Sequence, residues 1–272
     1  MIKDLMVSLE GTSADDVRLA AVEALASLFD AHITGPFLST MPPLSETDGA
    51  GLGSTVLDRA REVAALTEKT IVEKLARLNR PAEVRRIDVL SDDIAETASR
   101  EARGVDAFVA LRPNGGSEDP ERLVEGVLFG SGRHLFLIPD GQVPRPEFRS
   151  VLIAWNGSRE SARALSEAMP YLSRAKAITV VVVDEGYPTE LQALVGHDAV
   201  RHLKHHGLEA RLRRVLDREH DVGRALVEEA ERLEADLMVM GGYGHSRMRE
   251  MWLGGVTQEL LHGAPLPLVI AH

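Results

Sequence analysis

Apolar and polar residues follow two different periods along this chain. Short, nearly continuous apolar runs such as "VLIAW" and "ITVVVVD" are typical of buried strands, and longer segments with apolar residues three or four positions apart are typical of amphipathic helices. In the second half the pattern predicts strands near 151–155, 178–183, 210–216, 236–240 and 267–271, and helices near 159–173, 189–206, 220–234 and 255–263. In the first half it predicts strands near 2–8, 32–38, 83–89, 105–110 and 134–138, and a long helix from about 56 to 78.

The two halves repeat one pattern. "DLMVSLEGTS", which starts at Asp4, matches "SVLIAWNGS" from Ser150, and "GVDAFVALRP" and "HLFLIP" match "EADLMVMGGY" and "PLVIAH". Apolar strands that alternate with helices indicate right-handed βαβ units and a parallel sheet. The predicted fold class is therefore α/β, with two similar open five-stranded parallel-sheet domains in tandem. The Pro- and Gly-rich linker "IPDGQVPRPEFRS" separates a domain at 1–144 from one at 145–272.

Composition narrows the classes of partner. A net charge of -11 argues against a broad contact with nucleic-acid phosphates, which requires a basic surface. No apolar run approaches the roughly 20 residues of a membrane helix, and the start of the sequence lacks the pattern of a secretory signal. We therefore expect no nucleic acid and no membrane as partners, and a cytoplasmic location. The absence of cysteine excludes disulfides and thiolate metal sites.

A glycine-rich stretch, "MGGYGHSRMREMWLGGVT", follows the fourth predicted strand of the second half. Gly241 and Gly244 leave the strand, and Gly254 and Gly255 stand where the next helix should begin. Glycines at these places let backbone N–H groups approach an anion, so the stretch describes a phosphate cradle, with the hydroxyl of Thr257 as a further donor. It is neither a Walker loop nor a Rossmann fingerprint, and ordinary turn residues explain the glycines equally well on local grounds.

The glycine spacing resembles the G-x2-G-x9-G-[ST] signature of the universal stress protein family, whose members have an adenine nucleotide alpha hydrolase-like α/β domain and often bind ATP. "VLIAWNGS" is similar to that family's first strand and loop, and the two copies resemble its tandem two-domain members. The resemblance implies a nucleotide site whose adenine and ribose side is lined by Ala154, Trp155, Asn156 and Val182. It further implies sugar contacts from Met240 and Gly241, and phosphate contacts from Gly244, Gly254, Gly255, Val256 and Thr257.

The nucleotide site has two further features. His245 and Arg247 lie between the glycines and could add positive charge for a phosphate, although a solvated loop also explains them. Two positions depart from the family pattern: Asn156 replaces its usual aspartate, and Gly255 replaces the expected serine or threonine. The second change removes one hydroxyl donor, which is worth about 1 kcal/mol.

The first half departs further from the glycine pattern. With the last strands in register, Glu121 and Arg122 fall opposite Gly254 and Gly255, and an acidic residue at a helix start would compete with phosphate for the same N–H groups. Gly130 falls opposite Gly263, where glycine is an ordinary C-terminal cap. The sequence thus predicts one nucleotide site per chain, in the second domain, beside a degenerate first domain.

Other candidate residues give weaker evidence for a functional site. His202 and His206 have the spacing of two metal ligands on one helix face, but an exposed polar face is the favoured interpretation. Asp184 could approach the pocket or begin a turn. The Gly- and Pro-rich segment "STMPPLSETDGAGLGST" fits a plain loop better than a lid. No catalytic pair, nucleophile motif or metal site is predicted.

The function expected from the resemblance is that of an ATP-binding, non-catalytic regulator of the stress response, with or without Mg²⁺ beside the nucleotide. Two alternatives remain open. One is a slow metal-dependent ATP hydrolase that uses the same pocket, and the other is a nucleotide-free module for protein interaction. Exposed edge strands and the resemblance both point to a homodimer.

Overall fold

The computed structural model of the chain describes residues 1–42, 52–113, 118–139, 142, 147–184, 186, 194–217, 219–243 and 255–272. The chain divides into two compact units, which are described separately. The first contains Met1–Ala110 and Glu118–Arg133, and the second contains a strand at His134–Ile138 together with the chain after residue 144. No helix within these described ranges has both the length and the apolar character that crossing a bilayer requires.

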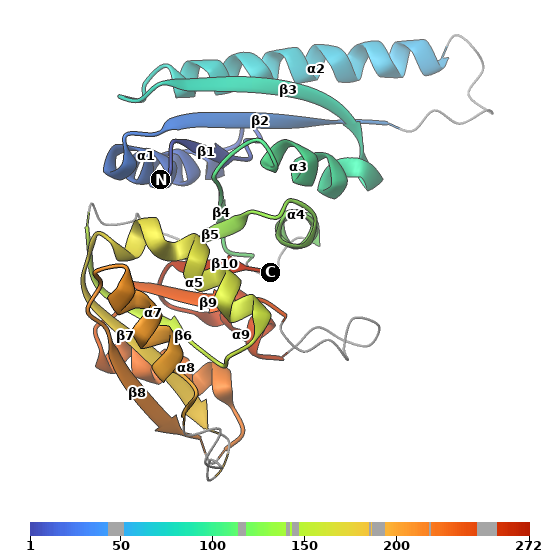
Figure 1. Cartoon of the computed structure of the whole chain (residues 1–272). Helices are drawn as coiled ribbons and strands as arrows, with labels where there is room; N and C mark the ends of the chain where they lie inside the picture. Colours follow the sequence, from blue (N-terminus) through green and yellow to red (C-terminus); the bar gives the residue numbers. More distant parts are fainter. Residues whose placement is uncertain are drawn as a thin grey trace. The chain divides into compact units, whose positions relative to one another are not determined.

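The first unit is built on parallel strands in the order β3-β2-β1-β4 (Figure 1). Their bounds are β1 Asp4–Val7, β2 His32–Met41, β3 Ala82–Leu90 and β4 Ala107–Leu111. The central strand β1 is apolar on both faces, and Leu5, Met6 and Val7 are fully buried. This is the pattern expected of a parallel strand covered by helices on both sides.

Helices cover both faces of the first sheet. They are α1 Ala14–Phe29, α2 Leu52–Leu75, α3 Ile94–Ala102, which follows a short 3-10 turn at Ser91–Asp93, and α4 Glu118–Gly130. Right-handed crossovers in this strand order place α1 and α2 on one face, and α3 and α4 on the other. Lys74 of α2 donates to Thr12 O at 2.8 Å and to Asp16 Oδ1 at 2.6 Å, which joins α2 to the start of α1.

Two glycines let α3 and α4 pack closely. A Cβ atom at Gly126 would lie 2.7 Å from the Cβ of Ala95, and one at Gly130 would meet the side chain of Ser99. Gly130 is the last residue of α4 and does not have the positive φ of a glycine cap, so its interpretation as a helix cap is wrong. The contact with Ser99 gives a packing reason for this glycine that the local sequence does not reveal.

The second unit contains strands in the order β5-β10-β9-β6-β7-β8 (Figure 1). Their bounds are β5 His134–Ile138, β6 Phe148–Ala154, β7 Ala175–Asp184, β8 Arg211–Leu216, β9 Leu237–Gly241 and β10 Leu268–Ala271. The pairs from β10 to β8 are parallel, whereas β5 pairs with β10 in the antiparallel direction, with Phe136 opposite Val269. The two compact units are therefore not consecutive stretches of chain.

The helices of the second unit are α5 Arg159–Leu172, α7 His197–His205, α8 Val222–Arg232 and α9 Gly255–Gly263. The α/β class predicted from the sequence is confirmed, and the strands are mostly parallel, with the β5–β10 pair as an antiparallel exception. The outermost strands β3 and β8 carry neighbouring arginines, Arg85 with Arg86 and Arg213 with Arg214. Charged residues on an edge strand discourage pairing with another sheet. The Gly- and Pro-rich loop of the first half falls mainly on residues 43–51, outside the described residues.

Candidate functional site

The carboxyl ends of β6 and β9 lie side by side in the second unit. Their register sets Ile153 opposite Val239, so the segments that follow the two strands leave the sheet next to each other. The chain order reverses at this point, because β7 flanks β6 on one side and β9 flanks it on the other. Open α/β sheets bind ligands at such a switch point.

The segment after β6 forms a tight turn into α5. Trp155 N donates to Val181 O at 2.9 Å, and Asn156 Oδ1 accepts from Ser158 N at 3.0 Å. Ser158 is the N-cap of α5, since its Oγ accepts from Ser161 N at 3.1 Å. The predicted site residue Asn156 is thus exposed at the helix start, with its oxygen used to hold the turn.

Two predicted site residues of the adenine side are buried. Val182 on β7 is 4% exposed and Trp155 is 8% exposed, whereas Ala154 at the end of β6 is half-buried. Within the described residues, the buried Nε1 atom of Trp155 has no hydrogen-bond partner. Buried donors are rarely left unpaired, so this indole N–H is suited to an acceptor outside the described residues.

Gly241 ends β9 directly against α5. A Cβ atom here would lie 2.5 Å from Glu160 C and 2.5 Å from Ser161 N, both of them backbone atoms that cannot rotate away. The preceding Met240 is buried and lies opposite Ile270 in β10. Glycine is therefore required at position 241 by the packing of the strand end on the first turn of α5.

A hydrogen bond joins the start of α9 to the segment that follows β9. Thr257 is buried, and its Oγ1 accepts from Tyr243 N at 3.1 Å. Gly255, the first residue of α9, is exposed and has open space around the position of a Cβ atom, and Val256 is half-buried. The predicted residues Gly244, His245, Arg247 and Gly254 lie outside the described residues.

Carboxylates flank α9 on the side of α8. Asp221 caps α8 by accepting from Arg224 N at 3.0 Å, and Glu259 of α9 packs against Gly223. Burial raises the pKa of Glu259, and its charge repulsion and hydrogen bond with Asp221 raise it further.

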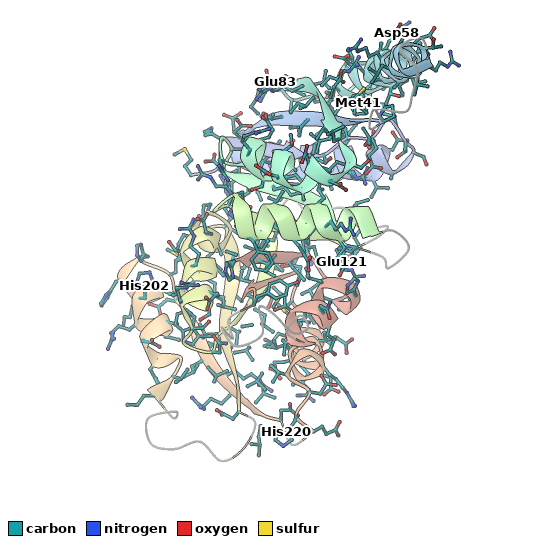
Figure 2. The ribbon with its side chains drawn as sticks, turned by 90° about the vertical axis from the view of Figure 1, so that its right-hand side faces the viewer. Met41, Asp58, Glu83, Glu121, His202 and His220 are labelled. Carbon is teal, nitrogen blue, oxygen red and sulfur yellow. The ribbon has the colours of Figure 1, made fainter. Side chains whose placement is uncertain are left out.

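The remaining candidates contact neighbouring side chains. Asp184, at the end of β7, accepts two hydrogen bonds from Arg214 at 2.6 Å and 3.0 Å, which ties β7 to β8. His202 on α7 (Figure 2) and His206 have their ring centres 4.7 Å apart. Among the described residues, no group of three or more metal-binding side chains occurs.

In the first unit, the turn after β1 corresponds to the turn after β6, and an acidic side chain binds its backbone N–H groups. Asp15 is fully buried and accepts from Glu10 N at 3.1 Å and from Gly11 N at 2.7 Å, and its Oδ1 lies 3.0 Å from Arg18 Nη1. Gly11 has φ 77°, a conformation that favours glycine. The sequence pattern did not single out Asp15, because an acidic residue in the first turn of a helix is common.

The strand order is that of an open α/β protein, a class in which ligands bind at the carboxyl ends of the strands. Residues 147–272 match the model of the Universal stress protein family. This half of the chain is therefore similar to the universal stress protein family, the family that its glycine spacing resembles.

The relatives with curated descriptions are also universal stress proteins. Universal stress proteins of Mycobacterium tuberculosis and Mycobacterium bovis are each 29% identical over 145 residues, which is 48% of this chain. The chain also spans about half, 48%, of the length of these relatives.

Solved structures resemble the fold of the whole chain. A universal stress protein of Archaeoglobus fulgidus has a TM-score of 0.73 with 17% identity, and the match covers 98% of this chain and 97% of that one. A protein of unknown function from Pseudomonas aeruginosa has a TM-score of 0.60 with 14% identity, covering 99% and 92% of the two chains. The fold of both halves together is thus one that universal stress proteins adopt.

Proposed function

We propose that the second unit binds one adenine nucleotide, ATP in the first instance, and that this binding regulates the protein without catalysis by the chain. The observation that carries the proposal is the bond from Tyr243 N to Thr257 Oγ1. It holds the exit of β9 and the start of α9 together at the switch point of the sheet. A helix start that faces the carboxyl end of a strand is a favourable place for phosphate.

The described residues fit such a ligand. The exposed Gly255, with open space where a side chain would stand, lets a phosphate approach the first N–H groups of α9, and Val256 supplies the next N–H. The indole N–H of Trp155, which has no partner in the described part of the chain, would gain one. Bound Mg²⁺ would neutralise phosphate charge.

The other predicted residues complete the proposed site. Gly244, His245, Arg247 and Gly254 would add phosphate contacts, Met240 and Gly241 would lie toward the sugar, and Ala154, Asn156 and Val182 would lie toward the base and ribose.

We propose one site per chain, with the sequence divided into a degenerate copy at 1–144 and a nucleotide-binding copy at 145–272. The turn N–H groups of Glu10 and Gly11 are already bound by the carboxylate of Asp15. Glu121 lies in the first turns of α4, where a negative charge disfavours phosphate.

Regulation would act through a second state of the protein that has a different affinity for nucleotide, such as a homodimer. The arginines of β3 and β8 do not favour sheet-to-sheet pairing, so the dimer would use another surface. Light scattering with and without ATP measures this step directly.

The binding test is isothermal titration of the full chain with ATP and, separately, with adenosine. We expect saturable ATP binding with one site per chain, and the absence of binding heat at millimolar ATP would overturn the proposal. Inorganic phosphate measured in the same samples separates binding from hydrolysis.

A matched pair of variants locates the site. Gly255→Glu places a negative side chain in open space at the start of α9, and Gly263→Glu places the same side chain in open space at the end of that helix. We expect Gly255→Glu to weaken ATP binding by at least about tenfold, because one unfavourable charge contact near phosphate is worth more than about 1.4 kcal/mol when partly desolvated. Gly263→Glu should change it less than twofold, and equal effects would contradict the placement.

A further inference from the structure

A cavity of about 500 Å³ lies in the first unit, between the second half of β2, the stretch of α2 from Val56 to Thr67, and Glu10. Its volume falls in the range of pockets that bind small molecules. Met41 at the end of β2 and Asp58 on α2 mark this region in Figure 2. Among the described residues, no part of β4 lines the cavity, whereas Glu10, in the turn after β1, does.

The walls of the cavity are mainly apolar. β2 contributes Phe37 and Leu38, and α2 contributes Val56, Val63 and Ala64. Val56 is 51% exposed and Val63 is 50% exposed, although both line the cavity. Large apolar side chains that remain half in water provide surface that a bound apolar molecule would bury.

The carboxyl-terminal half of α2 is anchored, and the cavity extends along the helix from Val56 to Thr67. Thr67 packs against Gly11, and Lys74 binds Thr12 O and Asp16 Oδ1. These contacts join α2 to the turn after β1 and to the start of α1, beside the cavity.

The charges at the cavity are balanced. Glu10 Oε1 lies 2.9 Å from Arg18 Nη2, and Arg59 Nη1 lies 2.7 Å from Glu62 Oε2. Each charged side chain that lines the cavity therefore already has an opposite charge beside it. A charged ligand would lose hydration without gaining a new counter-charge.

Hydroxyl groups are the remaining polar feature of the wall. Ser39 and Thr40 line the cavity, and Ser39 is 5% exposed. Hydroxyls can both donate and accept, so they suit a neutral polar group such as an alcohol or a carbonyl.

We propose that this cavity, which we call the α2 cavity, is a binding site for an uncharged, mostly apolar small molecule with one hydrogen-bonding group. The site is distinct from the nucleotide site proposed for the second unit and does not depend on it. The first unit would then carry a ligand function of its own.

The first test is a fluorescence titration of the full chain with 1-N-phenylnaphthylamine, an uncharged apolar probe. We expect saturable binding of one probe per chain, unchanged by millimolar ATP. We further expect 1-decanol to displace the probe at least tenfold more effectively than decanoate or decylammonium, because only the alcohol is neutral. Absence of saturable binding, or equal competition by a charged amphiphile, would overturn the proposal.

Two variants of α2 test whether the probe binds in the α2 cavity. Ala64→Phe fills the cavity from a position that is 3% exposed, and Leu66→Phe adds the same ring on the same helix at a position that is 64% exposed and does not line the cavity. We expect Ala64→Phe to weaken probe binding at least tenfold and Leu66→Phe to change it less than twofold.

A second wall variant keeps the test valid if Ala64→Phe does not fold. Val63→Asn changes a half-exposed wall residue into a polar one, so the fold should persist, as circular dichroism can verify. Weaker probe binding by Val63→Asn at unchanged melting temperature is the expected result. Unchanged binding in both wall variants would show that the probe binds elsewhere.

Discussion

The Nε2 atom of His134 lies 2.8 Å from the hydroxyl oxygen of Tyr171, and both side chains are buried. The other ring nitrogen, Nδ1, lies 3.1 Å from Glu167 Oε2, and the second oxygen of Glu167 pairs with Arg163 at 2.5 Å. His134 belongs to β5, and its two partners belong to α5, as does Arg163. This chain of polar contacts fixes β5 to the helix over the second sheet.

Tyr171→Phe removes the hydroxyl and leaves a buried histidine nitrogen unpaired. We expect it to lower the free energy of unfolding by about 1–3 kcal/mol, which is the usual cost of an unsatisfied buried polar group. Urea unfolding measures the change. The double variant His134→Phe with Tyr171→Phe should cost less than the sum of the two single changes, and strict additivity would contradict a direct bond.

Gly241→Ala tests why the strand exit carries a glycine. The added Cβ would collide with the backbone of Glu160 and Ser161, so we expect a loss of about 1–3 kcal/mol in the free energy of unfolding. Gly255→Ala is the matched control, because a Cβ there meets nothing within 4 Å. Equal stability of the two variants would refute the packing explanation.

Asp15→Ala tests the closed turn of the first unit. Asp15 accepts bonds from Glu10 N, Gly11 N and Arg18, and we expect its loss to cost about 2–3 kcal/mol. Asp16→Ala, next along the chain, removes only an exposed ion pair with Lys74 and should cost at most about 1 kcal/mol. Chemical denaturation of both variants provides the comparison.

Glu259→Gln tests the raised pKa on α9. The folded protein holds the proton of Glu259 to a higher pH than the unfolded chain does, so stability falls as the pH rises from the ordinary value of 4.5 through the raised one. Glutamine has no titratable proton, so the variant does not lose stability in this way. Its melting temperature should exceed that of the unmodified protein at about pH 7, with the difference shrinking below about pH 4; an excess that persists in acid would contradict this account.

Much of the fold follows from local sequence. Apolar runs of the length of β7 and β9 are buried on both faces, so their pattern predicts parallel strands directly. The antiparallel partner of β10 could not be predicted, because the direction of β5 depends on contacts between distant parts of the chain. The end of β2 at Met41 also lies beyond the predicted strand, since its register with β3 continues to Leu90.

The candidate site likewise has features that local sequence predicts and features that depend on distant contacts. The glycine spacing predicts where a strand ends and a helix begins, and the Tyr243–Thr257 bond joins those two places. The backbone contact of Gly241 with α5 is a tertiary feature that spacing alone does not encode. Likewise, the pairing of Asp15 with two turn N–H groups depends on a side-chain conformation, which the local pattern leaves undetermined.

The origin of β5 limits how the protein can be dissected. This strand comes from the first half of the sequence yet completes the second sheet beside β10. A fragment that begins at residue 147, where the family match begins, would expose the hydrogen-bonding edge of β10 and the apolar ring of Tyr171. Such a fragment should self-associate more strongly than one that begins before His134 and keeps the contact of Phe136 with Tyr171, and light scattering of the two fragments measures the difference.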